Sequence, residues 1–337
     1  MEETDEEIYT MIVKEIEQSL ANTRCERPLK ITNNQIQNII DEIFRNMRHR
    51  TSEKNRGVGM QFDIEEFNRR FSSNTEFNQI EEVEFESYFY PNTTVIKNKF
   101  DIMNQSELEE IEDLVVTNRL TILNLIIKMY LKYGYVDYSM FNIYGEDIDA
   151  INDILQFRFD INHLKSIHKF IFNPLYYFAG NIRDVDMSKM YFTMAKGELK
   201  GIYTSYTKPR YIKDELNNCF NEYTNRSVYP SKIEMSKYLS EFYLNLFRVH
   251  SFREGNKRTL REFFKQLVLV KYQDYDLDMI TLCEIKEKSN PKDDYEGNEF
   301  LRELITSLNF GYITYNFSSL FYNSLSEKEN AKRKTLV

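Results

Sequence analysis

Apolar residues recur every three or four positions along most of the chain, which is the spacing of helices with one buried face. This pattern predicts helices over three ranges outside the middle of the chain: about 1–20, 33–48 and 298–308. Ser106 and Glu109 are spaced like a capping box and predict the start of another helix. That helix is expected to end before Gly134, since glycine is favoured just past a helix C-terminus.

The middle of the chain follows the same pattern with one interruption. Helical spacing runs over 146–172 and returns at 233–249. Residues 182–194 alternate roughly between apolar and polar, which predicts a short hairpin or an extended flap. With only ten glycines and six prolines in 337 residues, long helices are favoured. The predicted fold class is therefore all-α, a helical bundle with a short β-hairpin flap and an additional helical N-terminal region.

Composition narrows the class of protein. A net charge of −9 makes the whole molecule a poor nucleic-acid binder. Its three cysteines are far apart and odd in number, which suits a reducing cytoplasm. The acidic start MEETDEEIYT is unlike a signal peptide. The apolar run 120–131 carries Asn124 and Lys128, which predicts a buried helix rather than a membrane span. We expect a cytoplasmic protein without nucleic-acid or membrane partners, and homo-oligomer formation is left open.

The stretch HSFREGNKRTLREFF, 250–264, places one of only four histidines between two apolar helical stripes. Gly255 can take backbone angles closed to other residues, and Asn256 is a good N-cap. Phe252 is expected to anchor the connector on the core. The free N–H groups at the start of the following helix suit a phosphate.

Charged side chains around this helix start extend the same site. Arg258, Arg261 and Lys265 fall on one helical face, which suits a polyphosphate chain. Glu254 is placed to hold Mg²⁺ against the phosphates, and His250 can take a proton near neutral pH. The stretch predicts a nucleotide site, with a basic helix–loop–helix around a core-packed histidine as the structural alternative.

Residues 250–261 resemble the signature of the Fic (filamentation induced by cyclic AMP) family, HPFxxGNGRxxR with an acid before the Gly-Asn pair. Two upstream blocks support the resemblance. FDINHLKSIHKFIFNPLYYFAGNIRDVDMSKMYF, 159–192, is similar to the family's upstream helix, turn and flap, and SKYLSEFYLNLFRV is similar to the helix before the motif. The resemblance implies three regions: a helical N-terminal region at 1–145, a Fic catalytic core at 146–275 and a helical C-terminal extension at 276–337.

The resemblance also implies an activity. Fic proteins commonly are protein adenylyltransferases, which use ATP and Mg²⁺ to attach AMP to a Ser, Thr or Tyr hydroxyl of a target protein, here with the chain itself as one candidate target. His250 is then implied as the general base and Glu254 as the residue that positions Mg²⁺. The residues implied to bind the nucleotide phosphates are Gly255, Asn256, Lys257, Arg258 and Arg261. Ser188, Lys189 and Phe192 resemble the flap that pairs with the target chain.

A segment near 71–82 resembles the family's inhibitory helix, whose glutamate pairs with the last arginine of the motif. Ser72 and Glu76 fit that pattern, whereas Phe77 stands where Gly or Asn is usual. An ordinary helix start with a serine cap is the alternative.

Lys257 departs most from the family pattern, because it replaces the second glycine of GNGR. It adds charge beside the phosphates and leaves open a kinase-like phosphotransferase that binds the nucleotide reversed. A separate alternative is a non-catalytic nucleotide-binding regulator. His163 and His168 lie in the upstream block without metal-like spacing, and we interpret both as structural. The expected location is the cytoplasm, or another cell into which the protein is delivered without a classical signal peptide.

Overall fold

The computed structural model describes residues 4–24, 29–48, 88–195, 198–224, 231–283 and 315–328. Its helices are α1 (Asp5–Arg24), α2 (Asn33–Arg48), α4 (Gln105–Tyr133), η1 (Tyr138–Phe141), α5 (Glu146–Ile154), α6 (Ile161–Phe172), α7 (Pro209–Thr224), α8 (Lys232–Val249), α9 (Asn256–Lys271), α10 (Met279–Cys283) and α12 (Tyr315–Ser324). The strands form two antiparallel pairs, β1 (Ser188–Ala195) with β2 (Glu198–Ser205) and β3 (Tyr275–Leu277) with β4 (Leu325–Glu327). The predicted all-α class with a β-hairpin flap is confirmed, and the helix predicted at 298–308 lies outside the described residues.

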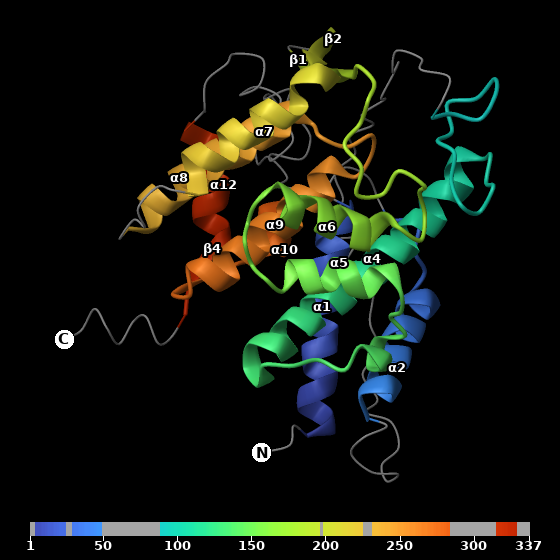
Figure 1. Cartoon of the computed structure of the whole chain (residues 1–337), viewed down its shortest axis with the longest axis vertical. Coiled ribbons are helices and arrows are strands. Elements are labelled where there is room, and N and C mark those ends of the chain that lie inside the picture. Colours follow the sequence, from blue (N-terminus) through green and yellow to red (C-terminus); the bar gives the residue numbers. More distant parts are fainter. Residues whose placement is uncertain are drawn as a thin grey trace.

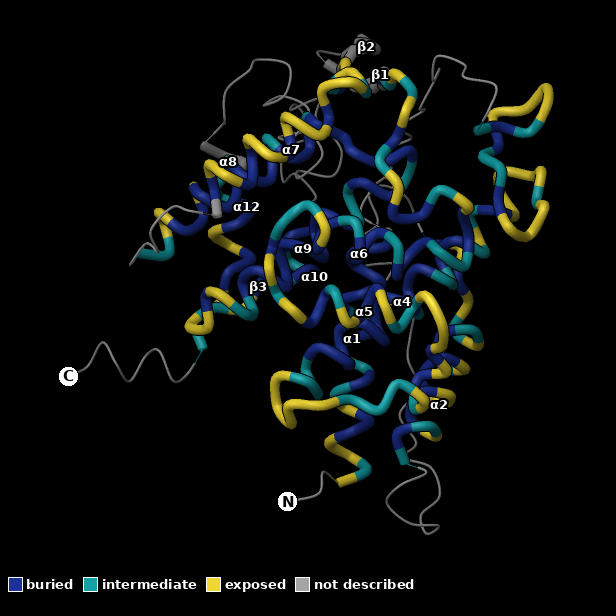
Figure 2. The backbone as a smooth tube through the Cα atoms, viewed as in Figure 1, coloured by how far each residue is buried: buried dark blue, intermediate teal, exposed yellow. Residues whose placement is uncertain are grey.

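Helices α6 and α9 lie side by side at the centre of the molecule (Figure 1). Contacts from α4 and α5 reach α6, while α1 and α8 both pack against α9. Helix α8 in turn packs against α7 and α12. Figure 2 shows α6 and α9 as mostly buried, in keeping with the buried apolar side chains Leu260, Phe263, Phe264 and Leu267 of α9. The 250–261 stretch, which leads from α8 into α9, therefore lies where α1, α6 and α8 pack against α9.

Helix α4 begins earlier than the sequence predicts. Its N-cap is Asn104, whose side chain accepts a hydrogen bond from the Glu107 amide at 3.1 Å. The capping box predicted at Ser106 is wrong, because Asn104 occupies the cap position with the same spacing to an acid three residues on. The predicted end is confirmed: Gly134 has a φ of 77°, and its N–H bonds to the Tyr130 carbonyl.

Helix α4 is long and apolar enough to cross a membrane by length and composition, and 61% of its most apolar window is buried inside the protein. It packs against α1, α2 and α6. The Arg119 guanidinium on this helix lies 3.7 Å from the Phe170 ring centroid and pairs with Asp147 at 2.8 Å. The expected helix at 120–131 is confirmed, and it is buried over 120–127, whereas Leu131 at its end is exposed.

Helix α1 is fastened to the core by a buried carboxylate. Glu15 is 1% exposed and pairs with Lys265 of α9 at 3.0 Å and with Lys128 of α4. Burial opposes ionisation of this carboxylate, but the two ammonium groups outweigh it and lower its pKa to about 2. Lys265 was predicted to face a polyphosphate, and in this structure its ammonium instead holds α1.

We expect Glu15→Gln to lower the free energy of unfolding by about 3–5 kcal/mol, because it leaves the buried Lys265 ammonium and the partly exposed Lys128 ammonium without their carboxylate. Since the folded-state pKa of Glu15 is depressed, its contribution is complete above about pH 4.5 and is lost as the pH falls toward about 2. Urea unfolding between these pH values should therefore show a steeper pH dependence for the wild type than for the variant. Exposed Glu6→Gln is the control, and equal loss in both variants would contradict the role of Glu15.

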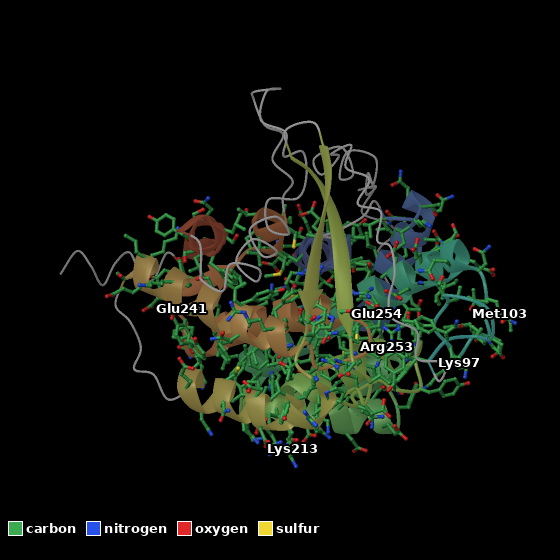
Figure 3. All side chains as sticks on the ribbon, turned by 90° about the horizontal axis from the view of Figure 1, so that it is seen from above. Lys97, Met103, Lys213, Glu241, Arg253 and Glu254 are labelled. Atoms are coloured by element: carbon green, nitrogen blue, oxygen red, sulfur yellow. The ribbon has the colours of Figure 1, made fainter. Side chains whose placement is uncertain are left out.

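The hairpin β1–β2 projects from the helical body (Figure 3). Its register pairs Ser188 with Ser205 and Ala195 with Glu198. At its base, the Tyr206 N–H donates to the Met187 carbonyl at 3.2 Å. The Tyr206 ring at this base also stacks on His250, which follows the end of α8, so the flap lies next to that end.

Candidate active site

His250 stands where α8 ends. The apolar stripe of α8 carries the chain into the core, and His250 then takes a left-handed conformation, with φ 50° and ψ 63°. Its imidazole stacks on the Tyr206 ring, with centroids 3.7 Å apart and planes 13° apart, and contacts the edge of Phe247. The residue is 3% exposed. The ring is thus clamped between α8 and the base of the hairpin.

The loop from His250 to α9 is closed by Asn256. Its side-chain oxygen accepts from the Phe252 amide at 2.8 Å, and its side-chain nitrogen donates to the Phe252 carbonyl at 2.6 Å. The N-cap of α9 is Gly255, with φ 76° and no side-chain cap, so the prediction of Asn256 as N-cap is wrong. Asn256 is instead the first helical residue. Its side-chain amide bonds to the N–H and the carbonyl of Phe252, both of which lie within reach, and so closes the loop. Phe252 is 2% exposed, which confirms it as the anchor of the connector.

We expect Gly255→Ala to lower both stability and activity. A left-handed conformation costs a residue with a Cβ about 1–2 kcal/mol, and the added Cβ would lie 2.4 Å from the Phe172 ring. Thermal unfolding and transfer assays measure the two losses. Gly134→Ala, which has φ 77° but open space around the Cβ, is the matched control for strain without a clash. Equal losses in both variants would contradict the close approach to Phe172.

Arg183 holds the backbone around His250 through its carbonyl oxygens. Its guanidinium donates to the carbonyls of His250 at 2.6 Å, Thr207 at 2.5 Å and Val249 at 3.3 Å. Burial lowers the pKa of Arg183 to about 10. From the sequence, Arg183 is only one residue of the block 159–192, and nothing in the local pattern showed that it would gather carbonyls from two separate segments.

Arg258 points back from the first turn of α9 into a pair of carboxylates. Its guanidinium pairs with Glu112 of α4 and, at 3.2 Å, with Glu254. The Tyr176 hydroxyl donates to the other oxygen of Glu112. Burial opposes the charge of Arg258, but the carboxylates Glu112 and Glu254 outweigh burial and raise its pKa. Burial and the Glu112 carboxylate together raise the pKa of Tyr176 well above its usual range.

Sequence reasoning missed Glu112 and Tyr176. A signal for Glu112 existed: it lies four residues from both Leu108 and Val116, so a carboxylate falls on the buried face of α4. A charge in such a position needs a partner, but the partner lies far along the chain.

Arg261 points from α9 toward α1. Its Nε donates to the Asn22 side-chain oxygen and one terminal nitrogen donates to the Asn22 carbonyl, both at 2.7 Å. The residue is 2% exposed. The two motif arginines thus diverge, with Arg258 facing α4 and Arg261 facing the C-terminal end of α1.

Glu254 lies at the end of the loop, directly before the N-cap Gly255, and its side chain is 28% exposed. Its Oε1 accepts from the Gly255 amide at 2.9 Å and from Arg258. Within the described ranges no three His, Cys, Asp or Glu side chains gather as a metal cluster. A magnesium ion here would take one carboxylate and complete its shell with phosphate and water oxygens, as Mg²⁺ commonly does. The donor chemistry fits that ion.

The residues from the upstream block to the middle of α9, 158–268, match the Fic/DOC family. This segment is a Fic/DOC domain. It contains His250, the loop, the start of α9 and the flap. Glu112, Glu15 and Asn22, which hold its charged side chains, come from the region before it.

Two curated proteins are similar to part of this chain. The first is protein adenylyltransferase VbhT of Bartonella schoenbuchensis, 27% identical over 234 residues, which cover 68% of this chain and 40% of VbhT. The second is probable protein adenylyltransferase y4lH of Sinorhizobium fredii, 28% identical over 192 residues, which cover 56% of this chain and 77% of y4lH. The chain therefore spans less than half the length of VbhT and about three quarters of y4lH.

Two solved structures of Bartonella effector proteins align with most of this chain, both at TM-scores below 0.5. BepC of Bartonella tribocorum with bound AMPPNP is 20% identical with a TM-score of 0.44, covering 72% of this chain and 97% of that one. The N-terminal Fic domain of a Bartonella quintana effector with bound ADP is 20% identical with a TM-score of 0.49, covering 73% and 97%. The nucleotides belong to those proteins.

The remaining predicted site residues fall in three places. Lys257 lies in the first turn of α9, with its ammonium 5.7 Å from the Phe247 ring centroid. Ser188, Lys189 and Phe192 lie on β1, opposite Ser205, Thr204 and Gly201. Ser72 and Glu76 of the predicted inhibitory segment lie outside the described residues.

Proposed function

We propose that the protein is a protein adenylyltransferase that moves AMP from ATP to a Ser, Thr or Tyr hydroxyl of a target protein. The observation that carries the proposal is the junction of α8 and α9, where His250 and the Gly255-capped helix start lie within one short, rigid loop. The Fic/DOC match over 158–268 and the two adenylyltransferase relatives support it.

The proposed chemistry divides between a base and an anion site. His250 takes the proton of the target hydroxyl, whose oxygen attacks the α-phosphorus of ATP while the bond to the β-phosphate breaks and pyrophosphate leaves. The Thr259 N–H donates to the Gly255 carbonyl, and the amides of the first turn of α9, which precede this bond, are the proposed donors to the phosphates. Positioning and charge stabilisation supply most of the rate in reactions of this type.

The charged residues then take separate proposed roles. Arg258 contacts the phosphates while Glu112 keeps its guanidinium in place. Arg261 meets the γ-phosphate end, which requires its contact with Asn22 to open. Glu254 positions Mg²⁺, which neutralises phosphate charge when bound.

The hairpin is the proposed docking element for the target. Among the described strands, β1 and β2 pair only with each other, so each has an outer edge on which an extended segment could add as a strand. Ser188, Lys189 and Phe192 of β1 are the proposed contacts. We also propose that the protein acts in the cytoplasm, of its own cell or of one into which it is delivered.

Intact mass spectrometry tests the reaction. The purified protein is incubated with ATP and Mg²⁺ beside His250→Ala. A gain of one AMP that is absent from the variant supports adenylyl transfer by the His250 site. A gain of one phosphate would instead support the phosphotransferase alternative suggested by Lys257. Label transfer from ATP labelled on the α- or the γ-phosphate, in a lysate of candidate targets, separates both from a binding module, which transfers neither.

If Glu76 restrains Arg261, Glu76→Gly should raise AMP transfer, because the arginine is then released toward the nucleotide. The rate of self-labelling at saturating ATP measures the effect. Glu82→Gly, in the same acidic segment, is the control. Unchanged turnover of Glu76→Gly would remove the inhibitory role of this segment.

A further inference from the structure

His168 of α6 touches two separate segments of the candidate site at once. Its ring is fully buried and stacks on Phe252, with centroids 3.9 Å apart and planes 13° apart. Its Nδ1 lies 2.8 Å from the Gly180 amide nitrogen, and its Nε2 lies 2.9 Å from the Glu254 carbonyl oxygen. One imidazole therefore joins the turn after α6 to the loop before α9.

The two contacts determine the tautomer. The Gly180 N–H can only donate, so Nδ1 must accept and carry no proton. A carbonyl oxygen can only accept, so Nε2 must carry the proton and donate to Glu254. Because Nδ1 accepts the Gly180 N–H, the ring is neutral rather than an imidazolium. His168 is thus a neutral side chain with one defined acceptor and one defined donor.

The donor contact reaches the proposed magnesium ligand through one peptide plane. The Glu254 carbonyl and the Gly255 N–H belong to the same planar peptide unit, so holding the oxygen sets the direction of the N–H. That N–H donates to Oε1 of Glu254 at 2.9 Å, the oxygen that also meets Arg258. Rotation of this one peptide would release the Glu254 carboxylate and redirect the first amides of α9.

We propose that His168 is a positioning residue for transfer, which orients the Glu254–Gly255 peptide and through it the Glu254 carboxylate and the start of α9. This inference rests on the proposed function, and it assigns His168 more than the structural role expected from the sequence. It requires the Nε2 contact in particular. If the ring only filled the core, loss of the Gly180 hydrogen bond and loss of the Glu254 hydrogen bond should have equal effects on transfer.

Two variants divide the contacts. In His168→Gln the side-chain amide reaches about as far as Nε2 and can still donate to the Glu254 carbonyl. In His168→Asn the side-chain oxygen lies near the place of Nδ1 and can still accept from Gly180, but the Glu254 contact is lost. Each variant loses one hydrogen bond, so each is the other's control for stability. The measurements are kcat and KM for ATP, the thermal midpoint, and amide hydrogen exchange of the segment 250–257 in the free protein.

We expect His168→Asn to lose about tenfold to a hundredfold in kcat, with faster exchange over 250–257, because the reacting groups are displaced. His168→Gln should stay close to the wild type in both, at a similar thermal midpoint. Equal behaviour of the two variants would overturn the proposal. If the wild type transfers no AMP, the proposed function fails, whereas the exchange comparison still decides the role of His168.

A measurement on the wild type covers the case in which neither variant folds. The ¹⁵N shifts of the imidazole report which nitrogen carries the proton. The neutral Nε2–H tautomer at pH 7 supports the proposal, and an Nδ1–H tautomer or an imidazolium overturns it.

Discussion

Replacing His250 with alanine should lower the rate of AMP transfer by about 10²- to 10⁴-fold, the usual contribution of a general base. Alanine removes the group that takes the hydroxyl proton. The surrounding backbone keeps its place, because Arg183 holds the residue 250 carbonyl rather than its side chain. The transfer of label from ATP labelled on the α-phosphate, at saturating ATP, measures the loss.

Two controls separate the lost base from a disturbed loop. His250→Asn suits the φ of 50° at this position, since asparagine tolerates the left-handed region, and should be as inactive as alanine. His163→Gln changes the other buried histidine of α6, whose Nε2 lies 3.0 Å from Gln266 inside the core, and should retain activity. An active His250→Asn variant, or an equally inactive His163→Gln at wild-type stability, would contradict the role of His250.

Replacing Arg258 with methionine should lower the free energy of unfolding by about 3–5 kcal/mol and stop transfer as well. Glu112 is 7% exposed and would be left as a buried carboxylate without its cation. Methionine is chosen because its side chain fills much of the space of the arginine and can pack on the Phe172 ring, which lies 5.0 Å from the guanidinium carbon. Urea unfolding and label transfer measure the two effects.

The double variant Arg258→Met with Glu112→Gln separates stability from activity. A glutamine at 112 carries no charge and can still accept from the Tyr176 hydroxyl, so most of the stability should return. Transfer should not return, because the proposed phosphate contact of Arg258 is still missing. A double variant as unstable as the single one would show that the buried charge is not the cause. Recovered transfer would show that Arg258 is dispensable.

Periodicity was enough to predict the helices up to α6 and helix α8, because burial of one face follows directly from apolar spacing, but it did not predict α7 or α12. The ends were less predictable. Asn104 and Ser106 are both good caps, and only the path of the chain before α4 selects Asn104. At α9 the rule for N-caps favoured Asn256, but Gly255 takes the cap because the Asn256 amide is used to close the loop on Phe252.

The amino-acid sequence alone is enough to predict the helical class and to locate the 250–261 motif with its order of histidine, acid, glycine and arginines. These follow from local spacing and from residue chemistry. The packing of distant helices sets the partner of each charged or polar group: Glu112 beside Arg258, Asn22 beside Arg261, Glu15 beside Lys265, and His168 beside the Glu254 carbonyl. The physical reason is that a buried charge or polar group must find a partner. That partner comes from whichever distant helix packs against it, and no local pattern specifies that helix.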